Sequence, residues 1–124
     1  MWVRCNPNPL GKQVGDCAIR AIAIATDKSW RNAYDDLCQL GGIMADLPNS
    51  NAVWGTYLKE RGAKQFLMPE NCPACITVRA FCERYPKGVY VIGTGDHAVT
   101  VIDGDWYDAF NSESMTPTYF WQVY

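Results

Sequence analysis

The chain has 124 residues, a length typical of one compact domain, and 48% of them are hydrophobic, which is enough to form a core. Charged residues make up only 19%, so the composition excludes a disordered protein. The net charge is −2 and no stretch concentrates Lys and Arg, so the sequence favours neither nucleic-acid nor anionic-membrane binding.

The first thirteen residues, MWVRCNPNPLGKQ, lack the apolar centre of a secretory signal peptide. The longest uninterrupted apolar run covers 21–25, far short of the about 20 residues that span a bilayer. We therefore expect a cytoplasmic protein in which thiols stay reduced. Three of the six cysteines, Cys5, Cys38 and Cys82, are expected to be free thiols buried as small hydrophobic residues.

The start of the chain is expected to be a loop that leads into a buried helix. Residues 1–15 contain Pro7 and Pro9, which favour irregular structure. Asp16 is a suitable N-cap for a helix over 17–26, and this helix is apolar around most of its circumference. A helix of that kind is buried in the core rather than lying on the surface.

Three further helices are expected, each preceded by a residue that can cap its first turn. The first runs over 30–40 and is capped by Ser29. The second is capped by Asn49 or Ser50 and runs through Arg61, and the third runs over 78–85 and is capped by Thr77. Gly41 and Gly42 are expected to end the first of the three, and Gly62 the second.

The last third of the chain is rich in Val, Ile, Tyr, Phe and Trp, which favour strands. The expected strands lie in GVYVIG, HAVTVI, DWYDAF and TYFWQVY, with a shorter candidate, KQFLM, before them. Asp103-Gly104 separates two of these segments and is a strong hairpin signal. Helices followed by an antiparallel sheet predict a single α+β domain over 1–124.

Cys17 is the candidate nucleophile because it opens the buried helix. Unpaired backbone N–H groups and the helix dipole at this end favour the thiolate, which is the reactive form of cysteine. Gly15 just before it allows a substrate to come close. An activated cysteine also needs a base, and His97 is the only histidine in the chain.

The hairpin supplies a candidate third member of the site. A two-residue turn at 103–104 places His97 and Asp108 on one face as diagonal neighbours, so Asp108 is favoured to orient the imidazole. A three-residue turn shifts the pairing by one and places Asn111 opposite His97, so Asn111 is the reserve. Trp106 shares the His97 face in the favoured register and is the tryptophan expected nearest to the site.

Attack of a thiolate on a carbonyl forms an oxyanion that needs hydrogen-bond donors already in place. The backbone N–H of Cys17 is one donor, and the side-chain amide of Gln13 is the candidate second. The alternative for Gln13 is an ordinary solvated loop residue.

These residues together resemble the papain-like cysteine peptidases. Gln13, Cys17 in GDCAIRA, His97 in GDHAVTVIDG and Asp108 in WYDAFNS stand in the order of that superfamily's oxyanion glutamine, nucleophile, histidine and orienting residue. DCAIRAIAIAT and HAVTVIDGDWYDAF also resemble small papain-like proteins of bacteria and phages. The resemblance implies a papain-like fold, with N-terminal helices packed on a C-terminal antiparallel sheet. It also implies a cysteine-dependent peptidase, isopeptidase or amidase that acts on a peptide or protein without cofactor or metal.

Other functions remain open from the sequence. A papain-like interaction module without turnover could use the same scaffold. Cys72 and Cys75 form a Cys-Pro-x-Cys motif that is found in redox proteins, although no βαβ unit precedes it. The same pair could contribute to a zinc site with Cys82 and a more distant cysteine, but a second Cys-x-x-Cys is absent from the sequence.

Overall fold

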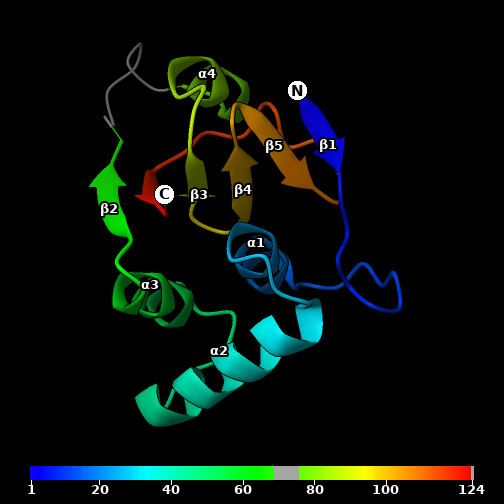
Figure 1. The fold of residues 1–124 in the computed structure, drawn as a ribbon, viewed down its shortest axis with the longest axis vertical. Coiled ribbons are helices and arrows are strands. Elements are labelled where there is room, and N and C mark those ends of the chain that lie inside the picture. The colour runs from blue at the N-terminus through cyan, green and yellow to red at the C-terminus, as the bar shows by residue number, and fades with distance from the viewer. Residues whose placement is uncertain (69–75, 124) are drawn as a thin grey trace.

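The computed structural model describes residues 1–68 and 76–123, which form an α+β domain with four helices and a six-stranded mixed sheet (Figure 1). The helices are α1 (Cys17–Ala25), α2 (Trp30–Met44), α3 (Asn51–Glu60) and α4 (Val78–Arg84). The strands are β1 (Trp2–Arg4), β2 (Lys64–Leu67), β3 (Val89–Gly93), β4 (Ala98–Ile102), β5 (Asp105–Asp108) and β6 (Tyr119–Gln122). None of the helices in the described ranges has the length and apolarity that crossing a membrane requires.

The sheet has the strand order β1-β5-β4-β3-β6-β2, and β1 alone pairs in parallel. The expectation of a loop over 1–15 and of a purely antiparallel sheet is therefore wrong for residues 2–4. Trp2 pairs with Trp106 and Arg4 with Asp108 at the sheet edge. A three-residue strand is too short for a recognisable alternation, and its partner lies about a hundred positions away, so local sequence does not reveal it.

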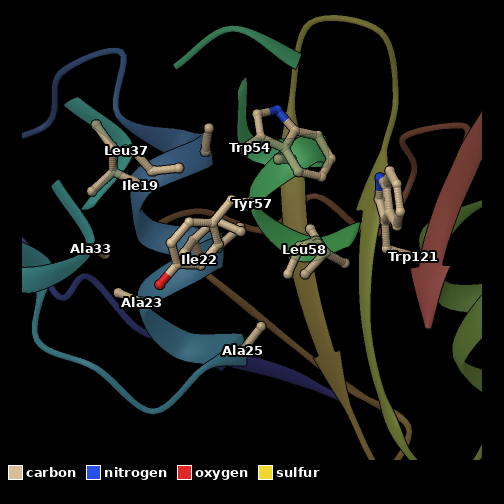
Figure 2. Close-up of a cluster of buried hydrophobic side chains, with 14 of the residues drawn as sticks. Ile19, Ile22, Ala23, Ala25, Ala33, Leu37, Trp54, Tyr57, Leu58 and Trp121 are labelled. Atoms are coloured by element: carbon tan, nitrogen blue, oxygen red, sulfur yellow. The ribbon is translucent and has the colours of Figure 1, made fainter. Parts of the chain in front are cut away.

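Two hydrophobic clusters lie on opposite faces of the sheet, because alternate strand residues point to opposite sides. The first cluster joins α1, α2 and α3 to the sheet, and Figure 2 shows side chains from these helices together with Trp121 of β6. The second cluster packs α4 against the other face. In Figure 1, α1, α2 and α3 gather in the lower half of the view and α4 lies at the upper end.

The burial of α1 around its whole circumference, predicted from its composition, is confirmed. Seven of its nine residues are buried, including its only charged one, Arg20. The hydroxyl of Thr100 on β4 donates a 2.7 Å hydrogen bond to the carbonyl of Ala21, which ties the helix to the sheet. α1 is thereby fixed against the middle of β4.

The expected end of α2 is wrong, because the helix continues through Gly41 and Gly42 to Met44. Ala45 then adopts a left-handed conformation with φ 54°. A Cβ on Gly41 would lie only 2.7 Å from the carbonyl oxygen of Asp46, so this glycine allows the following loop to fold back closely. Close approach, and not helix termination, is what this glycine provides.

The other predicted elements are confirmed within one or two residues. Ser29, Ser50 and Thr77 cap α2, α3 and α4 through their side chains. Cys82 is buried as expected, whereas Cys5 and Cys38 are only partly buried.

Candidate active site

Cys17 is the first residue of α1 and is partly buried. Asp16 occupies the N-cap position, as predicted, but its carboxylate makes no capping hydrogen bond to the helix. It pairs with Arg20 instead, because a buried guanidinium requires a counter-charge more strongly than a helix end requires a side-chain cap. Asp16 therefore leaves the backbone N–H groups that a side-chain cap would bind, those of the second and third helical residues, to other partners.

The hairpin has the register of the two-residue turn. Ile102 pairs with Asp105 and Val101 with Trp106, and the turn residues Asp103 and Gly104 both have positive φ. This register brings His97 Nε2 to 2.6 Å from Asp108 Oδ2, and the two side chains are 8% and 2% exposed. The structure therefore pairs His97 with Asp108, as predicted.

Asn111 does not take part in this pair. Its side chain is exposed, and its Oδ1 accepts hydrogen bonds from Trp106 Nε1 and from the backbone N–H of Glu113. The aromatic ring of Phe110 covers His97 instead, with ring centroids 5.0 Å apart.

His97 and Cys17 line the same cavity, and the imidazole lowers the pKa of the Cys17 thiol. Because Nε2 is engaged by Asp108, Nδ1 is the ring nitrogen that remains for the sulfur. The backbone N–H of Ala98 adds a second donor to Cys17. The nucleophile, the base and the orienting carboxylate predicted from the sequence therefore lie together in one site.

The electrostatics of this site favour a thiolate–imidazolium pair. Burial alone would raise the pKa of Cys17, but hydrogen bonds from His97 and Ala98 and the positive charges of His97 and Arg20 lower it below the ordinary value. Burial opposes protonation of His97, yet its bonds to Asp108 and Cys17 raise its pKa to about 9. At neutral pH these directions favour the proton on the imidazole and the negative charge on the sulfur.

The surroundings of Asp108 favour its ionised form, because the groups that hydrogen-bond to its carboxylate all stabilise the negative charge. Burial would raise the pKa of Asp108, but the bond and the charge of His97, the hydroxyl of Ser112 and the backbone N–H of Ala109 lower it. Ser112 donates to Oδ2 at 2.8 Å and Ala109 to Oδ1 at 2.8 Å. Ser112 is a site residue that the sequence reasoning missed.

Arg20 and Asp16 form a buried ion-pair network with Asp108. The sequence reasoning missed this network as well. Arg20 Nη2 lies 3.4 Å from Asp108 Oδ1, and Nη1 pairs with Asp16 Oδ1. Trp30 Nε1 donates to the other oxygen of Asp16 at 2.9 Å. A single charged residue within the apolar run of the helix was the signal available, but its partner lies 88 positions away.

A cavity of about 480 Å³ opens beside Cys17 and His97. The other residues that line it are Gly15, Ala18, Leu47, Asn49, Ser50, Asn51, Trp54, Gly95, Asp96 and Ala98. Asn51 joins two walls, since its Nδ2 donates to the carbonyl of Gly95 and its Oδ1 accepts from Trp54 Nε1. The cavity therefore lies between the start of α3, the start of α1 and the loop that precedes β4.

Trp54 is the tryptophan beside the site, so the expectation for Trp106 is wrong. Trp106 packs in the second hydrophobic cluster and lines a different cavity, of about 580 Å³, with Trp2. Tyr119 supports Trp54 by stacking on it, and the Tyr119 ring occupies the space that a Cβ on Gly93 would fill. Burial and then the charge of Cys17 raise the pKa of Tyr119.

Gln13 lies exposed in the loop before α1 and does not line the cavity. Its role as an oxyanion donor stays a prediction. Cys72 and Cys75 lie outside the described residues. Within the described ranges, no cluster of three or more His, Cys, Asp or Glu side chains is arranged to hold a metal ion.

No protein-family model, curated protein or solved structure matches the chain.

Proposed function

We propose that the protein is a cysteine-dependent hydrolase, a peptidase, isopeptidase or amidase with a papain-like fold and a Cys17–His97–Asp108 triad. The observation that carries the proposal is the 2.6 Å contact between His97 Nε2 and Asp108 Oδ2, together with an open cavity that Cys17 and His97 both line. His97 also lowers the pKa of Cys17. Nucleophile, base and orienting group in this relation are what covalent catalysis at a thiol requires.

Acylation begins from the thiolate–imidazolium pair. The sulfur of Cys17 attacks the carbonyl carbon, an S–C bond forms and the carbonyl oxygen becomes an oxyanion. The backbone N–H of Cys17, at the first position of α1, supports the oxyanion, and Gln13 is the candidate second donor. His97 then donates its proton to the leaving amine, the C–N bond breaks and a thioester remains on Cys17.

Deacylation restores the starting pair. Neutral His97 takes a proton from a water molecule, and the resulting hydroxide equivalent attacks the thioester carbon. The C–S bond breaks, the acyl group leaves as a carboxylic acid, and the sulfur departs as a thiolate beside protonated His97. Asp108 holds the imidazole in one orientation through both steps, because its Oδ2 stays bonded to Nε2.

The proposed substrate is a peptide or protein, bound in the cavity beside the thiol. Apart from the Cys17–His97 pair, the walls carry one charged side chain, Asp96, together with the amides of Asn49 and Asn51 and the hydroxyl of Ser50. Uncharged polar groups of this kind suit the amides of a peptide chain better than a highly charged ligand.

Selective alkylation tests the thiolate. We expect iodoacetamide at pH 6 to modify Cys17 at least about tenfold faster than any of the other five cysteines, because only a cysteine with a lowered pKa has much thiolate at that pH. Burial raises the pKa of Cys5, and it raises that of Cys82 to about 11. Mass spectrometry of the digested protein measures each rate separately.

A comparison with the unfolded protein distinguishes activation of Cys17 from its mere exposure. In the unfolded protein all six cysteines should react at similar rates, since the contacts with His97 and Ala98 are lost. If Cys17 of the folded protein reacts at pH 6 no faster than Cys5, the proposed activity is refuted.

Replacing Gly15 by leucine tests the cavity as the acyl-binding site. A Cβ at Gly15 meets no atom within 4 Å, so the variant should fold, while its side chain narrows the cavity. We expect reaction with a peptidyl chloromethyl ketone to slow roughly tenfold, and reaction with the smaller iodoacetamide to change less than about twofold. Gly42→Leu is the matched control, because Gly42 also has open space around its Cβ but lies on α2 away from the cavity. Equal rates in both variants would show that the substrate binds elsewhere.

A further inference from the structure

Arg20 is the buried cation closest to the proposed triad. It is 6% exposed and, among the buried polar and charged residues of the described ranges, it is the only one with a permanent positive charge. Its two partners, Asp16 and Asp108, are each 2% exposed. The guanidinium and the two carboxylates depend on one another, because each of these charges alone would be strongly unfavourable in the interior.

The guanidinium divides its donors between two separate segments. Nη1 pairs with Asp16, one turn earlier on the nucleophile helix, and Nη2 reaches Oδ1 of Asp108 on the hairpin at 3.4 Å. The planar fork of arginine makes this division possible, whereas lysine offers a single charged point. The helix that carries Cys17 and the strand that carries Asp108 are thereby joined beneath the site.

The two oxygens of Asp108 have different partners, and the difference bears on His97. Oδ1 faces Arg20 and the backbone N–H of Ala109, while Oδ2 faces His97 and Ser112. A carboxylate fixed on one oxygen cannot rotate away from the imidazole on the other. Asp16 is held in the same way, since Trp30 and Asn8 donate to the oxygen that does not face Arg20.

We propose that Arg20 is a positioning residue of the proposed hydrolase: by bridging Asp16 and Asp108, it fixes the carboxylate that orients His97 and aligns it with the helix that carries Cys17. The inference rests on the proposed function, but it concerns a residue that touches neither the substrate nor the sulfur. It predicts that the properties of His97 and Cys17 depend on a side chain with which neither of them forms a hydrogen bond.

Arg20→Lys is the decisive variant because it keeps the positive charge and removes the fork. With one anchor lost, Asp108 is held less firmly, so the pKa of His97 should fall from about 9 toward its ordinary value of 6.5. Other charged or titratable groups near the pair are Cys17, Asp16, Asp96 and Tyr119, and the substitution leaves all of them in place. We expect the alkylation rate of Cys17 at pH 6 to fall about tenfold, since a weaker imidazolium stabilises less thiolate.

Two measurements separate a positioning role from a purely structural one. NMR titration of the imidazole measures the pKa of His97 without ambiguity, because the chain has no other histidine. The pH profile of iodoacetamide alkylation measures the ionisation of the Cys17 thiol. Arg84→Lys is the matched control, since Arg84 is exposed at the end of α4 and belongs to the other side of the sheet. It should leave both the titration and the profile as in the wild type.

Asp16→Asn provides a second route to the same answer if Arg20→Lys fails to fold. It weakens the far anchor of the guanidinium without altering any group that touches His97. The same downward shift of the His97 pKa, of smaller size, supports the proposal. A lower melting temperature with an unchanged His97 titration and an unchanged Cys17 profile in the folded variant overturns it. Failure of the proposed hydrolase would instead show as an unreactive Cys17 in the wild type, while the titration would still report on Arg20.

Discussion

Replacing His97 by alanine is expected to lower the alkylation rate of Cys17 at pH 6 by roughly a hundredfold. The substitution removes the hydrogen bond and the positive charge that lower the pKa of Cys17, while the burial that raises it remains. The thiol therefore becomes harder to ionise than in the wild type, and less thiolate is left below neutral pH. Hydrolysis of any substrate should fall further, because the leaving amine also loses its proton donor.

The measurement is the rate of modification of each cysteine by iodoacetamide between pH 5 and pH 10, followed by mass spectrometry. Cys82 is the internal control, since its pKa of about 11 arises mainly from burial on the other side of the sheet. Its rate should be the same in His97→Ala and in the wild type. A His97→Ala protein that folds and keeps the full reactivity of Cys17 at pH 6 would remove the basis for the triad.

The hairpin that places His97 beside Asp108 could be predicted because its signals are local. Asp103-Gly104 supplies the turn, both turn residues adopt positive φ, and a strand has a fixed period of two residues. Once the turn length is chosen, the face of every residue on both strands follows. The burial of α1 was predictable for a similar reason, since a helix with almost no polar face has no side to present to water.

The contacts that join distant segments could not be predicted in this way. Arg20 binds Asp108 across 88 positions, and nothing in the sequence near either residue indicates the other. Trp54 lines the cavity because α3 packs beside α1, a tertiary arrangement that period and capping signals do not contain. The failure at Gly41 has the same origin, because its role is set by the loop that folds back on it and not by helix propensity.

The environment of Asp108 explains why an acid, and not an amide, is needed at this position. Its two oxygens receive hydrogen bonds from four donors, two at each oxygen. An asparagine there has only one oxygen, so in either orientation its NH₂ group would face two donors. If the oxygen faces His97, the amide opposes Arg20, and that guanidinium loses one of its two counter-charges.

Asp108→Asn is therefore expected to reduce hydrolysis by roughly 10²- to 10⁴-fold, the range in which loss of the orienting carboxylate acts in a triad. The pKa of His97 should fall from about 9 toward 6.5, because the bond to Asp108 is the largest contribution that raises it. In a pH profile of the rate, the alkaline limit that His97 sets near pH 9 should move to lower pH, since the imidazole must be protonated to donate to the leaving group. NMR titration of the single histidine measures the shift directly.

Asp105→Asn is the matched control, as Asp105 lies on the same strand and its carboxylate pairs only with the amino group of Met1 among the described residues. A His97 pKa that stays near 9 in Asp108→Asn would mean that the negative charge of Asp108 does not hold the proton on the imidazole.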